Sequence, residues 1–106
     1  MYGVVKIGDK DIEMVANAAT PFRFKAVFHK DLIVIMTGGD TAEISEVIPE
    51  IAFIMAKQAE KADMNKLNID TFLDWLEQFA PLDVYTASDG IWSVFNGTGE
   101  TNTDPK

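Results

Sequence analysis

The amino-acid sequence predicts an α+β fold that is predominantly helical, with an N-terminal β-hairpin packed on a bundle of about four helices. The chain of 106 residues is 47% apolar and 25% charged, which is typical of one ordinary globular domain. Apolar and polar residues alternate near the N-terminus, as in strands, whereas later apolar residues recur every three or four positions, as in helices. We expect one globular domain over residues 1–96.

The hairpin is expected over residues 3–17, where two short apolar runs flank the polar turn Gly8-Asp9-Lys10-Asp11. Ile12, Met14 and Ala16 share one face of the second strand, although the alternation is imperfect because their neighbours include the apolar Val15. A lone hairpin is only marginally stable, so it must pack on another element. The helix that follows it is the obvious candidate.

The first helix is expected over about residues 21–29. Thr20 is suited to cap it and Pro21 fits its first position. Phe24, Val27 and Phe28 fall on one face, because residues three and four apart are neighbours on a helix. This face is predicted to be buried.

Two capping signals follow the first helix. His29 is expected to close it in the left-handed conformation, which histidine tolerates better than most residues. Asp31 is expected to cap a short segment, residues 32–37, whose apolar run fits a helix or a strand equally well. Gly38-Gly39-Asp40 then breaks the chain.

Three further helices are expected, over about residues 45–62, 69–79 and 83–95. In the first of them, Pro49 predicts either a start nearby or a kink. Asn68 is expected to cap the second, whose apolar residues fit the helical spacing without a gap; they are Phe72, Trp75, Leu76 and Phe79. Gly90 weakens the third. Residues 97–106 are small and polar and are predicted to form a flexible tail.

No residue constellation in the chain indicates catalysis. There is no cysteine and only one histidine, which excludes a sulfur metal site and a cluster of histidine ligands. The glycines match neither a dinucleotide-binding fingerprint nor a P-loop. We therefore expect no enzyme, no catalytic residue, no metal and no cofactor. No apolar run is long enough to span a bilayer, so no membrane partner is expected.

The net charge of −8 is unevenly distributed, because no basic residue lies between Lys66 and Lys106. Direct binding to nucleic acid is not expected, since phosphates require a cationic surface. Two interpretations of the acidic second half stay open. It keeps a small domain soluble, or it steers a basic partner.

Four segments of the chain together resemble a known family. They are Ile7-Gly8-Asp9-Lys10 in the hairpin, Thr20-Pro21 leading to Phe28-His29-Lys30-Asp31-Leu32, the string Ile51-Ala52-Phe53-Ile54-Met55-Ala56-Lys57-Gln58-Ala59, and Asp74-Trp75-Leu76-Glu77-Gln78-Phe79 followed by Ile91-Trp92. Over residues 4–95 their order and spacing resemble the small tail assembly chaperones of long-tailed bacteriophages and prophages of Gram-positive bacteria. The chain looks like the short form of such a chaperone.

This resemblance implies a non-enzymatic function. Members of the family act in the host bacterial cytoplasm and are absent from the mature virion. They bind the tape-measure protein, prevent its long hydrophobic helices from aggregating and help to recruit tail-tube protein around it. The same hypothesis predicts concentration-dependent self-association.

Five residues are candidates for contacting a partner: the spare aromatic residues Phe22, Phe53 and Trp92, with Arg23 and Lys25 at the rim. Each also has a purely structural interpretation. Phe53 in particular is either covered by a neighbouring element or left for a partner. The alternative function is an acidic protein-binding module, or a DNA mimic that blocks a DNA-binding protein.

Overall fold

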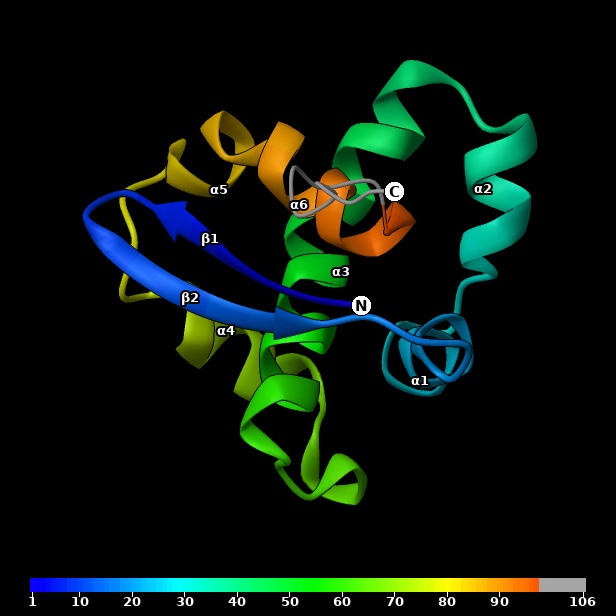
Figure 1. The fold of residues 1–106 in the computed structure, drawn as a ribbon. Helices are drawn as coiled ribbons and strands as arrows, with labels where there is room; N and C mark the ends of the chain where they lie inside the picture. The colour runs from blue at the N-terminus through cyan, green and yellow to red at the C-terminus, as the bar shows by residue number, and fades with distance from the viewer. Residues whose placement is uncertain (98–106) are drawn as a thin grey trace, which may run out of the picture.

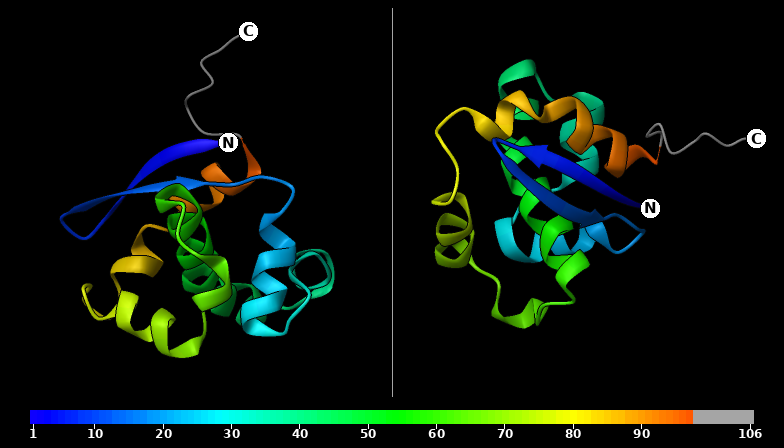
Figure 2. Two further views of the ribbon diagram at one scale, coloured as in Figure 1. Left: turned by 90° about the horizontal axis from the view of Figure 1, so that it is seen from below. Right: turned by 60° about the vertical axis from the view of Figure 1, so that its left-hand side comes forward.

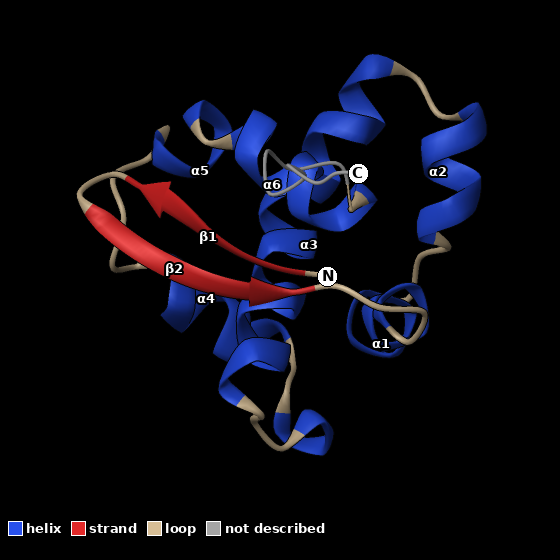
Figure 3. Cartoon of the chain, viewed as in Figure 1, coloured by secondary structure: helices blue, strands red, loops and turns tan. Residues whose placement is uncertain are grey.

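A computed structural model shows an antiparallel β-hairpin followed by a set of helices, which confirms the predicted fold class (Figure 1, Figure 3). The structure describes residues 1–97, so the tail predicted over 97–106 lies outside the described residues except for Gly97. The elements are β1 (Tyr2–Ile7), β2 (Lys10–Val15), α1 (Thr20–Phe28), α2 (Leu32–Gly38), α3 (Thr41–Glu60), the 3-10 helix η1 (Met64–Lys66), α4 (Ile69–Leu76), α5 (Asp83–Thr86) and α6 (Ser88–Asn96).

The hairpin turns through Gly8-Asp9, and Ile7 on β1 is paired with Lys10 on β2. Gly8 has a φ of 65°, a left-handed conformation that glycine adopts without strain. The predicted inner face is confirmed, because Met14 is fully buried and Ala16 nearly so. Lys10 and Asp11, expected in the turn, instead belong to β2.

The hairpin packs against α3 and α6 rather than against α1, which corrects the expectation from the sequence (Figure 2). Two glycines permit this close approach. A Cβ atom on Gly3 would lie 2.6 Å from Cγ2 of Val94 in α6, and one on Gly90 in α6 would lie 3.1 Å from Cγ1 of Val5 in β1. Gly90, which weakens the helix locally, is therefore placed where β1 crosses it.

The long helix α3 occupies the centre of the fold and contacts β2, α1, α2, α4, α5 and α6. It begins at Thr41, earlier than predicted, because Asp40 and Glu43 form a capping box. Pro49 therefore lies inside the helix, where it removes one backbone hydrogen bond. The helix continues through Pro49 because this part is surrounded by other elements. Six consecutive residues, 51–56, are all buried.

An aromatic layer joins α1, α3 and α4. The ring of Phe28 lies 5.0 Å from that of Phe72 and 6.3 Å from that of Phe53, measured between centroids. The Phe53 ring is also 5.7 Å from Trp75. Phe24, fully buried, extends the layer on the α1 side at 5.2 Å from Phe28. The predicted buried face of the first helix is thus confirmed.

The remaining helices differ from the prediction mainly in number. Residues 32–38 form a helix rather than a strand, with the Asp31 carboxylate accepting a hydrogen bond from the Val34 amide. The predicted helix 69–79 ends at Leu76, although its Asn68 cap is confirmed. The predicted helix 83–95 is divided into α5 and α6 at Ala87. Between residues 1 and 97 the fold therefore contains six α-helices rather than about four.

Among the residues described, no helix combines the length and the apolar character that crossing a membrane would require.

An ion-pair cluster holds the α1–α2 connection against α3. Lys30 Nζ lies 3.1 Å from Oε1 of Glu46 and 3.1 Å from Oε1 of Glu50. Burial raises the pKa of the Glu50 carboxyl, and the Lys30 ammonium only partly opposes this effect. Burial lowers the pKa of Lys30, but its hydrogen bonds and charge interactions with Glu50 and Glu46 outweigh that and raise it. Glu50 is the more buried partner, so the pair does not fully compensate the burial of its carboxylate.

Phe24→Ala should lower the free energy of unfolding by about 3–5 kcal/mol, because it removes a fully buried ring from the aromatic layer. Urea unfolding followed by circular dichroism measures the change. Phe22→Ala, a change on the same helix at a residue that is 77% exposed, is the matched control and should alter stability by less than about 0.5 kcal/mol. Equal effects would contradict the assigned burial.

The raised pKa of Glu50 predicts a pH-dependent difference between the parent chain and Glu50→Gln. As pH rises from about 4, the unfolded Glu50 loses its proton before the folded one does, which favours the unfolded state. The parent should therefore lose stability relative to Glu50→Gln over this range and then run parallel to it. Urea unfolding of both proteins between pH 4 and pH 7 tests this. A relative gain would mean that Lys30 overcompensates the burial.

Candidate protein-binding groove

A groove of about 390 Å³ lies between α1 and η1 on the surface. We call it the α1–η1 groove. Its lining is mainly apolar and consists of Ala19, Phe22, Arg23, Ala26, Val27, Met64, Asn65 and Leu67. A surface hollow of this kind, with apolar walls and few polar groups, is suited to hold side chains of another molecule.

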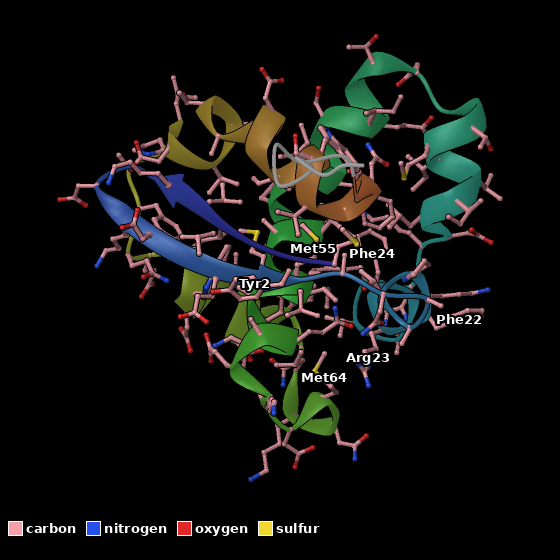
Figure 4. All side chains as sticks on the ribbon, viewed as in Figure 1. Tyr2, Phe22, Arg23, Phe24, Met55 and Met64 are labelled. Carbon is pink, nitrogen blue, oxygen red and sulfur yellow. The ribbon has the colours of Figure 1, made fainter. Side chains whose placement is uncertain are left out.

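The α1 wall follows from the amphipathic pattern of that helix. Phe24 and Val27 face the core, so Phe22, two positions before Phe24, is directed away from it and is 77% exposed. Figure 4 shows Phe22 projecting outward from α1 and Arg23 on the side nearer to Met64. Phe22 is the most exposed large apolar side chain among the residues described.

The opposite wall is built by the connection between α3 and α4. Lys61 ends α3 in a left-handed conformation, with a φ of 57°. The Asp63 side chain then accepts a hydrogen bond from the Asn65 amide and starts η1. This turn places Met64 and Leu67 partly buried against the core. Their remaining exposed surface faces the groove.

A polar network beneath the groove fixes the start of α1 on α3. Gln58 of α3 accepts a hydrogen bond from Arg23 Nη1 at 2.9 Å. Its amide nitrogen donates to the carbonyl of Val15 at 2.6 Å and to Thr20 Oγ1 at 2.9 Å. Both Gln58 and Thr20 are buried, so these hydrogen bonds satisfy groups that would otherwise be left without a partner.

Thr20 has a different role from the predicted one. It lies inside α1, where Ala19 precedes the helix without a side-chain cap. Its hydroxyl oxygen accepts hydrogen bonds from the Asn17 amide and from Gln58. The residue therefore joins the loop after β2 to α3 instead of capping the helix. The predicted closure at His29 is confirmed, with a φ of 59°.

The structure brings together two of the five predicted partner-binding residues, Phe22 and Arg23. Lys25 is exposed on α1 but does not line the groove. Trp92 is partly buried on α6, outside the groove, with its ring 5.8 Å from Phe95. Phe53 must be withdrawn from the candidates. It is fully buried because α4 covers it with Phe72 and Trp75.

Three residues that shape the groove were missed from the sequence: Gln58, Met64 and Leu67. Residues 63–67 look like a polar connection, and the apolar pair Met64 and Leu67, spaced by three, was the signal of a helical turn. Gln58 offered no comparable signal. A glutamine on a long helix is usually exposed, and only the tertiary structure reveals that it is buried.

Within residues 1–97, no group of three histidine, cysteine, aspartate or glutamate side chains is arranged to hold a metal ion. Comparison with models of protein families, with curated proteins and with solved structures found no match for this chain.

Gln58→Ala should lower the free energy of unfolding by about 2–3 kcal/mol, because it leaves the Val15 carbonyl and the Thr20 hydroxyl without their shared donor. The control is Gln78→Ala, at an exposed glutamine whose side chain, within residues 1–97, bonds only to the Trp75 carbonyl three residues earlier. That change should stay within about 0.5 kcal/mol in the same urea titration. A neutral Gln58→Ala variant would show that the network contributes little.

Proposed function

We propose that this chain is a non-enzymatic tail assembly chaperone of a long-tailed bacteriophage or prophage, acting in the host cytoplasm and absent from the mature virion. In this proposal it binds the tape-measure protein through the α1–η1 groove and helps to recruit tail-tube protein. The observation that carries the proposal is the exposed Phe22 beside an apolar groove. An exposed aromatic next to such a groove is suited to shield apolar side chains of another protein.

The sequence resemblance supplies the identity of the partner, and the groove supplies a means of binding it. A tape-measure protein is expected to present long amphipathic helices before assembly. An amphipathic helix laid into an apolar groove is one of the recurring modes of peptide recognition. Phe22 and Met64 stand on the two sides of the groove, where they would contact the apolar face of such a helix.

The acidic charge of −8 favours a second candidate, an acidic module or DNA mimic that blocks a DNA-binding protein. In that case binding would depend on carboxylates and would weaken steeply with added salt. It would not depend on the apolar surface at Phe22. A substitution at Phe22 should therefore impair binding by the chaperone but not binding by the acidic module, which separates the two candidates.

Phe22→Ser should reduce the amount of tape-measure fragment kept soluble by co-expression with the chain, because it removes the largest exposed apolar contact of the groove. The fraction of fragment in the cleared lysate measures this. Leu82→Ser, at a residue that is 69% exposed and outside the groove, is the matched control and should leave solubilisation unchanged. Equal solubilisation with parent and Phe22→Ser would contradict the assignment of the groove. Failure of the parent chain to solubilise the fragment would contradict the function.

A further inference from the structure

The two segments that border the α1–η1 groove are basic, although the chain as a whole is strongly acidic. The segments that border it, residues 20–28 and 61–67, contain four of the nine basic residues of the chain. These are Arg23, Lys25, Lys61 and Lys66. The same segments contain one of the seventeen acidic residues, Asp63. The formal charge of these two segments is therefore opposite in sign to the net charge of −8.

These four cations are also left without carboxylate partners inside the described part of the chain. The ion pairs among residues 1–97 use Lys6, Lys30 and Lys57 instead. Apart from Lys10 in the hairpin, the basic residues without an ion pair between residues 1 and 97 are those of the two bordering segments. Such an uncompensated positive surface favours a negatively charged partner.

Among the residues that the structure describes, Arg23 is the one charged side chain that lines the groove itself. Its Nη1 is held by Gln58 at 2.9 Å, and Gln58 is in turn fixed by Val15 and Thr20. A guanidinium has five N–H donors in a planar fork, and this is its only side-chain hydrogen bond to the residues described. Its remaining donors are available to a carboxylate, which the fork binds through two parallel hydrogen bonds.

The walls of the groove favour a helix over an extended peptide. Backbone amides of α1 and η1 are bonded within their own turns, as in Arg23 to Ala19 and Leu67 to Met64. An extended peptide would find no strand edge in these walls, whereas a helix satisfies its own backbone groups. Residues 98–106 of this chain do not supply the apolar side chains that such a groove would hold, because they contain no aliphatic or aromatic side chain apart from the Pro105 ring.

We propose that the α1–η1 groove recognises an acidic amphipathic helix of a partner protein, with apolar side chains against Phe22 and Met64 and a carboxylate bound by Arg23. Arg23 is then the specificity-determining residue and Gln58 its positioning residue. The identity of the helix as part of the tape-measure protein rests on the proposed function. The chemistry of recognition, an apolar face and a carboxylate, is independent of the proposed function.

The test uses two synthetic helical peptides of about 18 residues, long enough to be appreciably helical. Both carry leucines along one face, and they differ only in a glutamate or a glutamine one turn from the central leucine. Isothermal titration calorimetry with the full chain should give binding about tenfold tighter for the glutamate peptide, the effect of one charge-assisted hydrogen bond. Equal affinities would overturn the proposal.

Three variants test whether Arg23 causes the preference for the glutamate peptide. Arg23→Gln should abolish the difference between the two peptides, and Arg23→Lys should retain only part of it, because lysine keeps the charge without the fork. Lys10→Gln removes a basic residue outside the groove and should keep the full preference. Circular dichroism and urea unfolding check that each variant is folded. A preference that survives Arg23→Gln would overturn the proposal.

A second copy of this chain is the competing occupant, because α4 exposes Ile69 and Leu73 next to Asp70 and Asp74. Analytical ultracentrifugation without peptide addresses it. Self-association that Arg23→Gln abolishes, without a peptide preference, would overturn the proposal in favour of that contact. Solubilisation of the tape-measure fragment without a glutamate preference would overturn this inference and leave the proposed function standing. A preference for the glutamate peptide without solubilisation of the fragment would support this inference and contradict the proposed function.

Discussion

The burial of residues 51–56 of α3 on every side of the helix is the constraint on which the rest of the structure depends. A helix whose residues 51–56 are all buried must be enclosed by other elements, and here β2 and five helices supply the cover. None of those elements is large enough to form a core alone, since a two-stranded sheet and helices of about two turns are marginal in isolation. Their stability comes from contact with α3.

Gln58 is the one polar residue among the buried residues of α3, and it connects the core to the surface. Its side chain reaches the end of β2, the first turn of α1 and the guanidinium of Arg23. Each bond alone contributes about 1 kcal/mol, but leaving a buried group without a partner costs more. Formation of the core therefore fixes the α1 wall of the α1–η1 groove. The partly exposed Arg23 is held in place by the buried Gln58.

Local features of the fold were predictable from the sequence, whereas tertiary neighbours were not. The caps at Asp31 and Asn68 and the closure at His29 depend on residues next to them in the chain. For Phe53 the sequence left two interpretations, cover by a neighbouring element or contact with a partner, because a helical wheel places it beside Lys57, whose Nζ lies 5.9 Å from its ring centroid. The structure confirms the first of them. The wheel contains no information about α4, which covers the ring. Within the candidate site, Phe22 and Arg23 were predictable from α1 alone, but Gln58 was not.

In the proposed complex, the separation of charge between the segments that border the groove and the rest of the chain would give the groove a selectivity that the net charge of −8 conceals. A negatively charged helix is repelled by most of an acidic surface, and at physiological ionic strength each charge acts over only about 8 Å. In the proposed complex, attraction would be confined to the α1–η1 groove, whose bordering segments carry Arg23, Lys25, Lys61 and Lys66. Apolar contact at Phe22 without this match would accept any exposed hydrophobic segment. In the proposed mode of binding, repulsion elsewhere and a fixed guanidinium in the groove would together favour one orientation and one kind of helix.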